Sequence, residues 1–146
     1  MRFLNCRIDL SKWAFMPRTE TEFWVKKAIS KIKSDENTSR RIKVLDMFAG
    51  SGCIGIAVLK NIKNSQVDFV DIDKKAIEQI KINLKLNRIA SSRYKIYQSD
   101  LFKKLKNKKY GYTFANPPYV AEDRIGEVQP SVLEYEPKKA LFGGKK

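Results

Sequence analysis

The tetrapeptide Asn116-Pro117-Pro118-Tyr119 carries groups that can hold a planar NH2 group for reaction at its nitrogen. An amide or aryl amine is a poor nucleophile, because its lone pair is delocalised into the adjoining π system. The Asn116 side-chain oxygen and the Pro117 carbonyl can accept both N–H groups, which favours a pyramidal nitrogen with an exposed lone pair. The prolines make the loop rigid, and Tyr119 can pack on the planar group. We therefore expect transfer of an electrophilic carbon to nitrogen by positioning and electrostatics, without a metal or a strong base.

A glycine-rich turn earlier in the chain can hold the electrophile. Residues 50–55 read Gly-Ser-Gly-Cys-Ile-Gly and fit a dinucleotide-binding fingerprint, in which glycines let the backbone approach a ligand closely. Two acids favour S-adenosylmethionine over a dinucleotide. Asp46 would repel a pyrophosphate but can hold the ammonium group of a methionine moiety, and Asp71 can accept hydrogen bonds from ribose hydroxyls. A glycine turn that serves packing alone is the competing interpretation.

Further residues are candidates for contacts with the ribose and adenine of the same nucleoside. Asp73 competes with Asp71 for the ribose, but we interpret it as the N-cap of the following helix. Asp100 can accept a hydrogen bond from the adenine amino group, with Leu101 and Phe102 over the ring, or it can cap a helix; the two roles are compatible. The predicted contacts of the methyl donor are Asp46, Phe48, Gly50, Gly52, Asp71, Asp100, Leu101 and Asn116.

The hydrophobic pattern places these groups on alternating strands and helices. Buried strands are predicted at residues 42–45, 66–70, 94–97 and 112–115. Helices are predicted from a Thr21 cap to Lys33, from the glycine turn through Ile62, and after Asp73 through Leu84. The first helix has a predicted apolar face of Phe23, Val25, Ala28, Ile29 and Ile32. Residues 3–16 are predicted to form a short hairpin and residues 34–41 a loop.

Helices between strands predict an α/β fold with a doubly wound, mostly parallel sheet. Every candidate functional group follows a strand, and open α/β sheets bind ligands at the carboxyl ends of their strands. The chain has 146 residues, which predicts a single catalytic domain over 1–146. Within it we expect the hairpin and a Pro-Arg motif in 1–20, the donor-binding units in 21–115, and the catalytic loop with a C-terminal segment in 116–146.

The formal net charge is +14, and much of the positive charge lies in residues 74–109. Such a balance favours an anionic partner, for example RNA. A lysine-rich solvated surface without a partner is the alternative interpretation, and the sequence leaves both open.

Several function classes are disfavoured by composition. Histidine is absent, which removes the commonest general base and the commonest metal ligand, so no metal is expected. Cys6 and Cys53 are too far apart in sequence for a zinc pair and suggest reduced thiols in a cytoplasmic protein. No apolar run is long enough to span a membrane, and residues 1–10 do not resemble a secretory signal.

These segments together resemble the release-factor glutamine methyltransferases (the HemK family). Residues 17–22, Pro-Arg-Thr-Glu-Thr-Glu, match the family's Pro-Arg-Pro-Glu-Thr-Glu except at Thr19. Residues 44–46 with 50–52 match its donor motif, 70–73 its ribose segment and 98–102 its adenine segment. Residues 136–144 match a stretch beyond the catalytic tetrapeptide, and Phe3 matches an aromatic of the glutamine pocket.

The resemblance implies a class I S-adenosylmethionine-dependent methyltransferase that modifies the side-chain amide of a glutamine in the Gly-Gly-Gln loop of a peptide-chain release factor. It also implies the substrate contacts Phe3, Pro17, Arg18, Glu20, Asn116, Pro117, Pro118 and Tyr119, with Asn116, Pro117 and Tyr119 as the catalytic residues. Family members carry an additional amino-terminal helical domain and further strands. We therefore expect a split enzyme completed by a second polypeptide, or a truncated remnant with weak activity.

Two other functions stay open at this point. The Asn-Pro-Pro-Tyr segment and the basic charge would also suit a methyltransferase for an amino group on a nucleic-acid base, which needs a flipped or single-stranded target. A catalytically silent module that binds S-adenosylmethionine is the third candidate.

Overall fold

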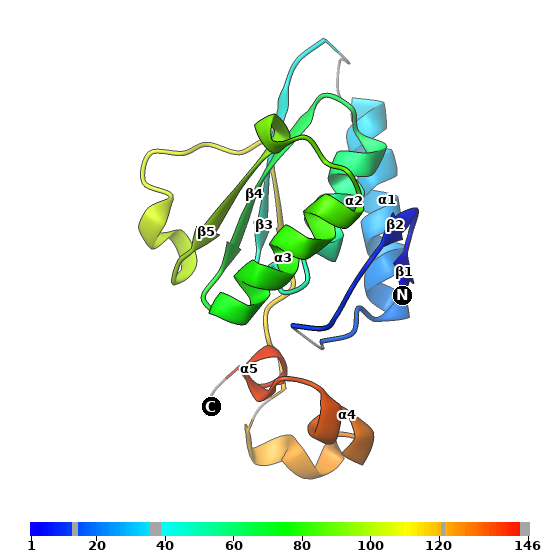
Figure 1. Ribbon diagram of the computed structural model, residues 1–146, viewed down its shortest axis with the longest axis vertical. Helices are drawn as coiled ribbons and strands as arrows, with labels where there is room; N and C mark the ends of the chain where they lie inside the picture. The colour runs from blue at the N-terminus through cyan, green and yellow to red at the C-terminus, as the bar shows by residue number, and fades with distance from the viewer. Residues whose placement is uncertain (13–14, 36–38, 121, 144–146) are drawn as a thin grey trace.

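Four parallel strands form the central sheet in the order β5-β4-β3-β6 (Figure 1). They are β3 (Ile42–Met47), β4 (Ser65–Asp71), β5 (Tyr94–Gln98) and β6 (Tyr112–Ala115). The structure, a computed structural model, describes residues 1–12, 15–35, 39–120 and 122–143. All four predicted strands are present and mutually parallel, which confirms the α/β prediction; β3 extends two residues further than predicted, so Asp46 lies inside it.

Three helices cover one face of this sheet: α1 (Thr19–Asp35), α2 (Cys53–Asn61) and α3 (Lys74–Leu86). Their apolar residues share one core with Val44, Val67 and Phe114 of the strands. The opposite face packs against the β5–β6 connection, which contains the 3-10 helix η2 (Leu101–Lys104). Successive strand residues point to opposite faces, so Leu45, Met47 and Val70 face away from the three helices. Together with Leu105 of the β5–β6 connection they form a second, smaller core.

The connections reverse direction between β3 and β6. From β3 the chain proceeds through β4 to β5 and then crosses back to β6 on the other side of β3. A doubly wound sheet binds its ligand in the crevice at such a reversal, outside the carboxyl ends of the strands. In Figure 1 these ends point towards α4 (Pro130–Tyr135) and α5 (Lys138–Leu141), which lie below the sheet.

Helix α1 differs from the prediction in its start and in its apolar face. Thr21 is not the N-cap: the helix begins at Thr19, the Arg18 carbonyl accepts from the Glu22 N–H at 3.1 Å, and Thr21 is buried in the first turn. The buried face contains Val25 and Ile29, whereas Phe23 is 61% exposed. Two residues advance a helix by about 200°, so Phe23 and Val25 point in nearly opposite directions.

The amino-terminal segment is a smaller hairpin than predicted. Strands β1 (Arg2–Phe3) and β2 (Cys6–Arg7) have two residues each, and residues 13–14 of the predicted hairpin lie outside the described part. Beyond β2 the chain follows α3. The Asn83 side chain accepts from the Asp9 N–H at 2.8 Å, and the Gln79 side chain accepts from the Lys12 N–H at 2.7 Å. Asn83 also donates to the Ser51 carbonyl at 2.9 Å, so one buried amide joins this segment to the glycine turn.

Beyond β6, the chain passes through the 3-10 helix η3 (Glu122–Glu127), α4 and α5. It returns to the residue after the Asn116–Tyr119 segment through a parallel bridge between Val120 and Phe142. Gly144 of the predicted C-terminal motif and residues 36–38 of the predicted loop lie outside the described residues. Among the described residues, no helix is long and apolar enough to cross a membrane.

Candidate functional site

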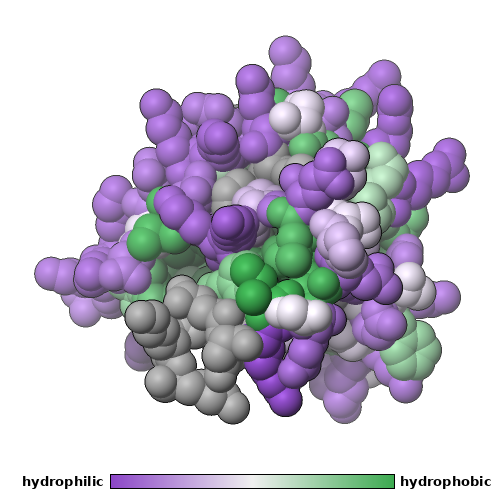
Figure 2. All heavy atoms as spheres, turned by 90° about the horizontal axis from the view of Figure 1, so that it is seen from below, coloured by the Kyte–Doolittle hydropathy of each residue, from purple (hydrophilic) through white to green (hydrophobic). Residues whose placement is uncertain are grey.

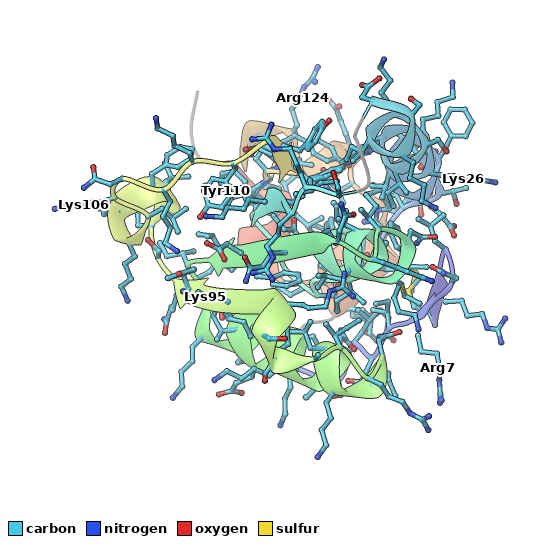
Figure 3. The ribbon with its side chains drawn as sticks, turned by 90° about the horizontal axis from the view of Figure 1, so that it is seen from above. Arg7, Lys26, Lys95, Lys106, Tyr110 and Arg124 are labelled. Carbon is cyan, nitrogen blue, oxygen red and sulfur yellow. The ribbon has the colours of Figure 1, made fainter. Side chains whose placement is uncertain are left out.

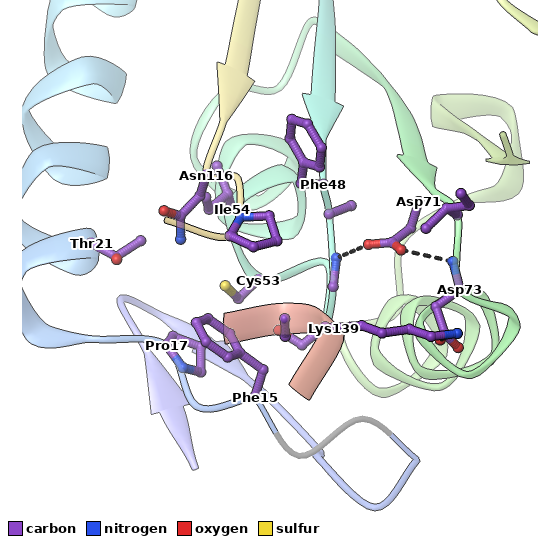
Figure 4. A pocket seen from close by; sticks show the side chains of 16 residues that line it. Phe15, Pro17, Thr21, Phe48, Cys53, Ile54, Asp71, Asp73, Asn116 and Lys139 are labelled. Atoms are coloured by element: carbon purple, nitrogen blue, oxygen red, sulfur yellow. Dashed lines mark hydrogen bonds and ion pairs between the residues drawn. The ribbon is translucent and has the colours of Figure 1, made fainter. Parts of the chain in front are cut away.

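A cavity lies at the carboxyl edge of the sheet, where β3 and β6 end (Figure 4). Of the residues predicted to contact donor or substrate, it is lined by Pro17, Phe48, Gly50, Asp71, Asn116 and Pro118. Figure 2 views the molecule from this end and shows a hydrophobic patch on a largely hydrophilic face.

The glycine turn has a backbone that few residue types adopt. Phe48, Gly50 and Gly52 have φ angles of 58°, 55° and 76°, in the left-handed region that favours glycine. The turn is fastened to β4, because the Ala49 N–H donates to the Val70 carbonyl at 3.0 Å. Gly52 shapes the turn but does not line the cavity.

Asp71 is held rigidly at the cavity wall. Its Oδ2 accepts from the Gly50 N–H at 2.8 Å, and its Oδ1 accepts from the Asp73 N–H at 3.0 Å (Figure 4). Burial raises the pKa of this carboxyl, while the two backbone hydrogen bonds act in the opposite direction. Each oxygen keeps acceptor capacity for a ligand hydroxyl. Asp73 caps α3 as predicted, since its side chain accepts from the Lys75 N–H at 2.8 Å, and it also lines the cavity.

Asp46 lies behind the glycine turn rather than in the cavity wall. Its Oδ2 accepts from the Gly55 N–H at 2.8 Å, while its Oδ1 is buried and has no hydrogen-bond partner among the described residues. Burial raises the pKa of Asp46 to about 8; the Gly55 hydrogen bond opposes this shift and the charge of Asp71 adds to it. The structure thus holds a buried acceptor oxygen that could pair with a cation.

Asp46 should make the unliganded fold lose stability as the pH rises. The pKa is about 8 in the folded state and near its ordinary 3.8 in the unfolded chain, so between these values the folded state binds more protons. The free energy of unfolding should therefore fall from about pH 4 to about pH 8. Urea unfolding of wild type and Asp46→Asn at several pH values measures this. The variant should lose most of the pH dependence; an unchanged slope would assign it to other groups.

Asn116 reaches the cavity because of strand register. Ala115 pairs with Met47 in the parallel β3–β6 ladder, so Asn116 and Phe48 both leave the sheet at the same edge. No described residue hydrogen-bonds to the Asn116 side chain, and in Figure 4 it lies on the opposite side of the cavity from Asp71. Pro117 is exposed outside the wall, and Tyr119, predicted to pack on the substrate, is 73% exposed and also outside it.

Other predicted contacts lie elsewhere. Phe3 is buried in the main core, so its ring cannot contact a ligand in this conformation, and Glu20 is exposed on the first turn of α1. Asp100 and Leu101 do not line the cavity, and the Asp100 carboxylate pairs with Lys103 at 2.5 Å. The alternative role of Asp100 as a side-chain cap is wrong, since its side chain makes no capping hydrogen bond.

Further residues line the cavity that were not predicted as contacts. They are Phe15 and Thr21 on the amino-terminal side, Ala49, Ser51, Cys53 and Ile54 in and after the glycine turn, Ile72 after β4, and Lys139 and Ala140 of α5. Thr21, Ile72 and α5 lie within the motifs of residues 17–22, 70–73 and 136–144, whereas neither a motif nor periodicity carried a signal for Phe15.

An ion pair joins the amino-terminal and carboxyl-terminal segments that contribute residues to the cavity. The Arg18 guanidinium donates through Nη1 to Glu136 Oε1 at 2.8 Å and through Nη2 to Glu136 Oε2 at 2.7 Å, and the Glu136 side chain is only 7% exposed. Arg18 does not line the cavity, and its guanidinium is engaged by Glu136; its contact with a substrate stays a prediction. Lys139 adds an ion pair with Asp73 at 3.6 Å. Pro17 and α5 are thereby held on the same cavity.

Arg18 and Glu136 should show energetic coupling in a double-mutant cycle. Removing either partner leaves a partly buried charge without compensation, whereas removing both does not. The urea unfolding free energies of wild type, Arg18→Ala, Glu136→Ala and the double variant should give an interaction free energy of about 1 to 3 kcal/mol. Strictly additive losses would show that the pair does not fasten the C-terminal segment.

No group of three or more His, Cys, Asp or Glu side chains could hold a metal ion within the described ranges. The cavity instead offers a carboxylate for hydroxyl groups at Asp71, an open amide at Asn116, and the exposed apolar side chains of Phe48 and Ile72 at its rim. This donor set fits a nucleoside with a positively charged group, and a second polar substrate beside it.

Comparison with known proteins agrees with this chemistry. The model of the methyltransferase small domain matches residues 29–135. Proteins named release factor glutamine methyltransferase from Thermodesulfovibrio yellowstonii and Flavobacterium psychrophilum are each 37% identical, over 142 and 144 residues. The alignments cover 97% of this chain and 50% and 48% of the relatives, so the chain spans about half the length of these curated relatives. They confirm the resemblance seen in the sequence motifs.

Solved structures agree on the fold. The N-terminal domain of human METTL16 in complex with SAH is 19% identical, with a TM-score of 0.59 over 93% of this chain and 58% of that one. The shared architecture confirms the expected class I methyltransferase fold. Because the family model matches residues 29–135, which include all four strands of the central sheet, the chain belongs to the methyltransferase small domain family.

Proposed function

We propose that this chain transfers a methyl group from S-adenosylmethionine to the side-chain amide nitrogen of a glutamine in a peptide-chain release factor. The observation that carries this function is the position of Asp71 and Asn116 in one cavity, on opposite sides of it. One side suits a nucleoside and the other an NH2 group. The names of the relatives, which are 37% identical to this chain, suggest the substrate.

The donor side consists of Asp71, Phe48 and the glycine turn. S-adenosylmethionine supplies an electrophilic methyl carbon on a positively charged sulfur. Asp71 accepts hydrogen bonds from the ribose hydroxyls, and Phe48 packs on the apolar part of the nucleoside. Asp46, with its unpartnered oxygen behind the turn, favours a positive charge in front of it. Asp100 and Leu101 stand outside the cavity wall and contact the adenine only at its outer edge.

The acceptor side consists of Asn116 and the two prolines. Asn116 Oδ1 and the Pro117 carbonyl accept the two N–H groups of the glutamine amide, which directs its nitrogen lone pair towards the donor. The carbon–nitrogen bond forms as the bond between the methyl group and sulfur breaks, S-adenosylhomocysteine leaves, and the methylated nitrogen loses one proton to solvent. Tyr119, exposed at the mouth, packs on the arriving loop of the release factor. Arg18 acts through Glu136 and keeps Pro17 and α5 in place around the substrate.

Methyl transfer with radiolabelled S-adenosylmethionine tests this function. The purified chain is offered a release factor, the same factor with its Gly-Gly-Gln glutamine replaced by asparagine, and nucleic acid in parallel. Label should appear only in the release factor that retains its Gly-Gly-Gln glutamine. Label only in nucleic acid would establish the base methyltransferase instead, and donor binding without any transfer would establish a silent module.

The surroundings of β6 bear on how the active protein is assembled. In the described part of the chain β6 pairs with β3 alone, and an uncovered strand edge favours association. We propose that a second polypeptide covers this edge. We also propose a cytoplasmic location, with which the two buried free thiols, Cys6 and Cys53, agree. Size-exclusion chromatography and calorimetry decide: a stable monomer with one cooperative transition would refute the need for a second polypeptide.

A further inference from the structure

The amino edge of the sheet, opposite the cavity, carries a strongly basic surface. Two adjoining hollows share Gln66 and lie along the starts of the strands. Their exposed cations form what we call the amino-edge groove: Arg41, Lys43, Lys63, Lys95, Lys108 and Lys109. Figure 3 looks down onto this edge, with Lys95 and Tyr110, which line the same hollow, on one side of the view.

Strand register brings these cations together. Lys43, Gln66 and Lys95 are each the second residue of a strand, and Lys43 pairs with Gln66 in the parallel ladder. Alternation turns all three away from α1, α2 and α3. The loop before β6 then adds Lys108 and Lys109 from the side.

The positive charge of the groove is not balanced by its own surroundings. Asp68 is the carboxylate among the lining residues; it is 9% exposed and already bonded to Tyr110 at 2.7 Å and Lys108 at 3.1 Å. Lys43, Lys95 and Lys109 form no ion pair with any described carboxylate. An array of exposed, unpaired cations concentrates anions near it.

The chemistry of the groove fits a phosphodiester backbone better than an acidic protein. Protein interfaces have an apolar or aromatic centre, and none of the large exposed hydrophobic side chains of the described residues lines either hollow. Lysine and arginine with amide side chains such as Gln66 and Asn107 are the usual partners of phosphate oxygens.

We propose that the amino-edge groove binds the phosphodiester backbone of a nucleic acid without reading its base sequence. The groove and the cavity lie at opposite edges of the sheet. The nucleic acid in the groove is therefore a docking partner and not the methyl acceptor. This inference is independent of the substrate of the cavity.

Salt-dependent fluorescence anisotropy with a short labelled RNA, and with DNA of the same sequence, tests the groove. The triple variant Lys43→Gln/Lys95→Gln/Lys109→Gln is compared with Lys74→Gln/Lys81→Gln/Lys85→Gln, three exposed lysines on α3 with the same total charge. The logarithm of the binding constant should fall linearly with that of salt concentration. The groove variant should reduce this slope by about 2 to 3, and the α3 variant by clearly less.

Three results would overturn the proposal: equal loss of slope in both triple variants, no binding of either nucleic acid by wild type, or equally tight binding of polyglutamate. The last would assign the groove to an acidic protein. Similar affinities for RNA and DNA support recognition of the shared phosphodiester backbone. A higher affinity for one of the two identifies that nucleic acid as the ligand of the groove. All six lysines are exposed, and thermal unfolding of each variant verifies that the fold is retained.

Discussion

Replacing Asn116 by alanine is expected to lower the rate of methyl transfer to the release factor by at least about a hundredfold, a typical cost for one preorganised hydrogen-bonding group. The side chain is not engaged by any described residue, so its removal should not disturb the fold. It lines the side of the cavity that we propose for the acceptor, so the affinity for S-adenosylmethionine should stay nearly unchanged. Single-turnover rates and calorimetric titration of the donor measure the two quantities separately.

Asp71→Ala is the matched variant from the other side of the same cavity. It removes the proposed acceptor for the ribose hydroxyls and leaves the Gly50 and Asp73 N–H groups without their partner, so it should weaken donor binding first. At saturating donor its rate should recover further than that of Asn116→Ala. If Asn116→Ala lost donor affinity while Asp71→Ala kept it, both assignments would be wrong.

The second large effect concerns stability. A Cβ atom at Gly55 would lie 2.3 Å from the Phe69 ring and 2.9 Å from Asp46 Oδ2. Both neighbours are fully buried, and neither can move without disturbing the core or the hydrogen bond from Gly55 to Asp46. Gly55→Ala should therefore lower the free energy of unfolding by about 3 kcal/mol, at the upper end of overpacking costs. Chemical denaturation measures the change.

Gly126→Ala is the control for this substitution. Nothing lies within 4 Å of a Cβ atom at Gly126, so the same chemical change should alter stability by no more than about 0.5 kcal/mol. If both variants unfolded at the wild-type denaturant concentration, α2 would not pack on β4 as closely as described.

Local signals predicted the elements well. Strands 94–97 and 112–115 are present with ends within one residue, and Asp73 caps α3 as predicted. Such features depend on side chains a few residues apart, which periodicity and capping preferences report directly. The prediction failed for Phe23 in α1, because Phe23 and Val25 cannot both lie on the buried face of one helix. In the structure Val25 is buried, and the Phe23 ring faces the solvent with Lys27 Nζ 4.5 Å from the ring centroid.

Contacts between segments that are far apart in the chain could not be predicted from the sequence. Nothing local indicates that Arg18 pairs with Glu136, that Asn83 bonds to both Asp9 and Ser51, or that Tyr119 points outward. Each depends on strand order and on the path of a connection. These are set by the packing of the whole chain and not by the residues concerned.

The amino acids themselves determined which chemistry is available: an amide and a rigid proline loop for a nitrogen acceptor, and glycines with carboxylates for a charged nucleoside donor. The tertiary structure decided where these groups act. Parallel register set Asn116 beside Phe48, burial withdrew Asp46 and Phe3 from the cavity wall, and the return of the chain placed α5 over it. Residue type sets what a group can do, whereas its burial and neighbours follow from contacts across the chain, which no short stretch of sequence encodes.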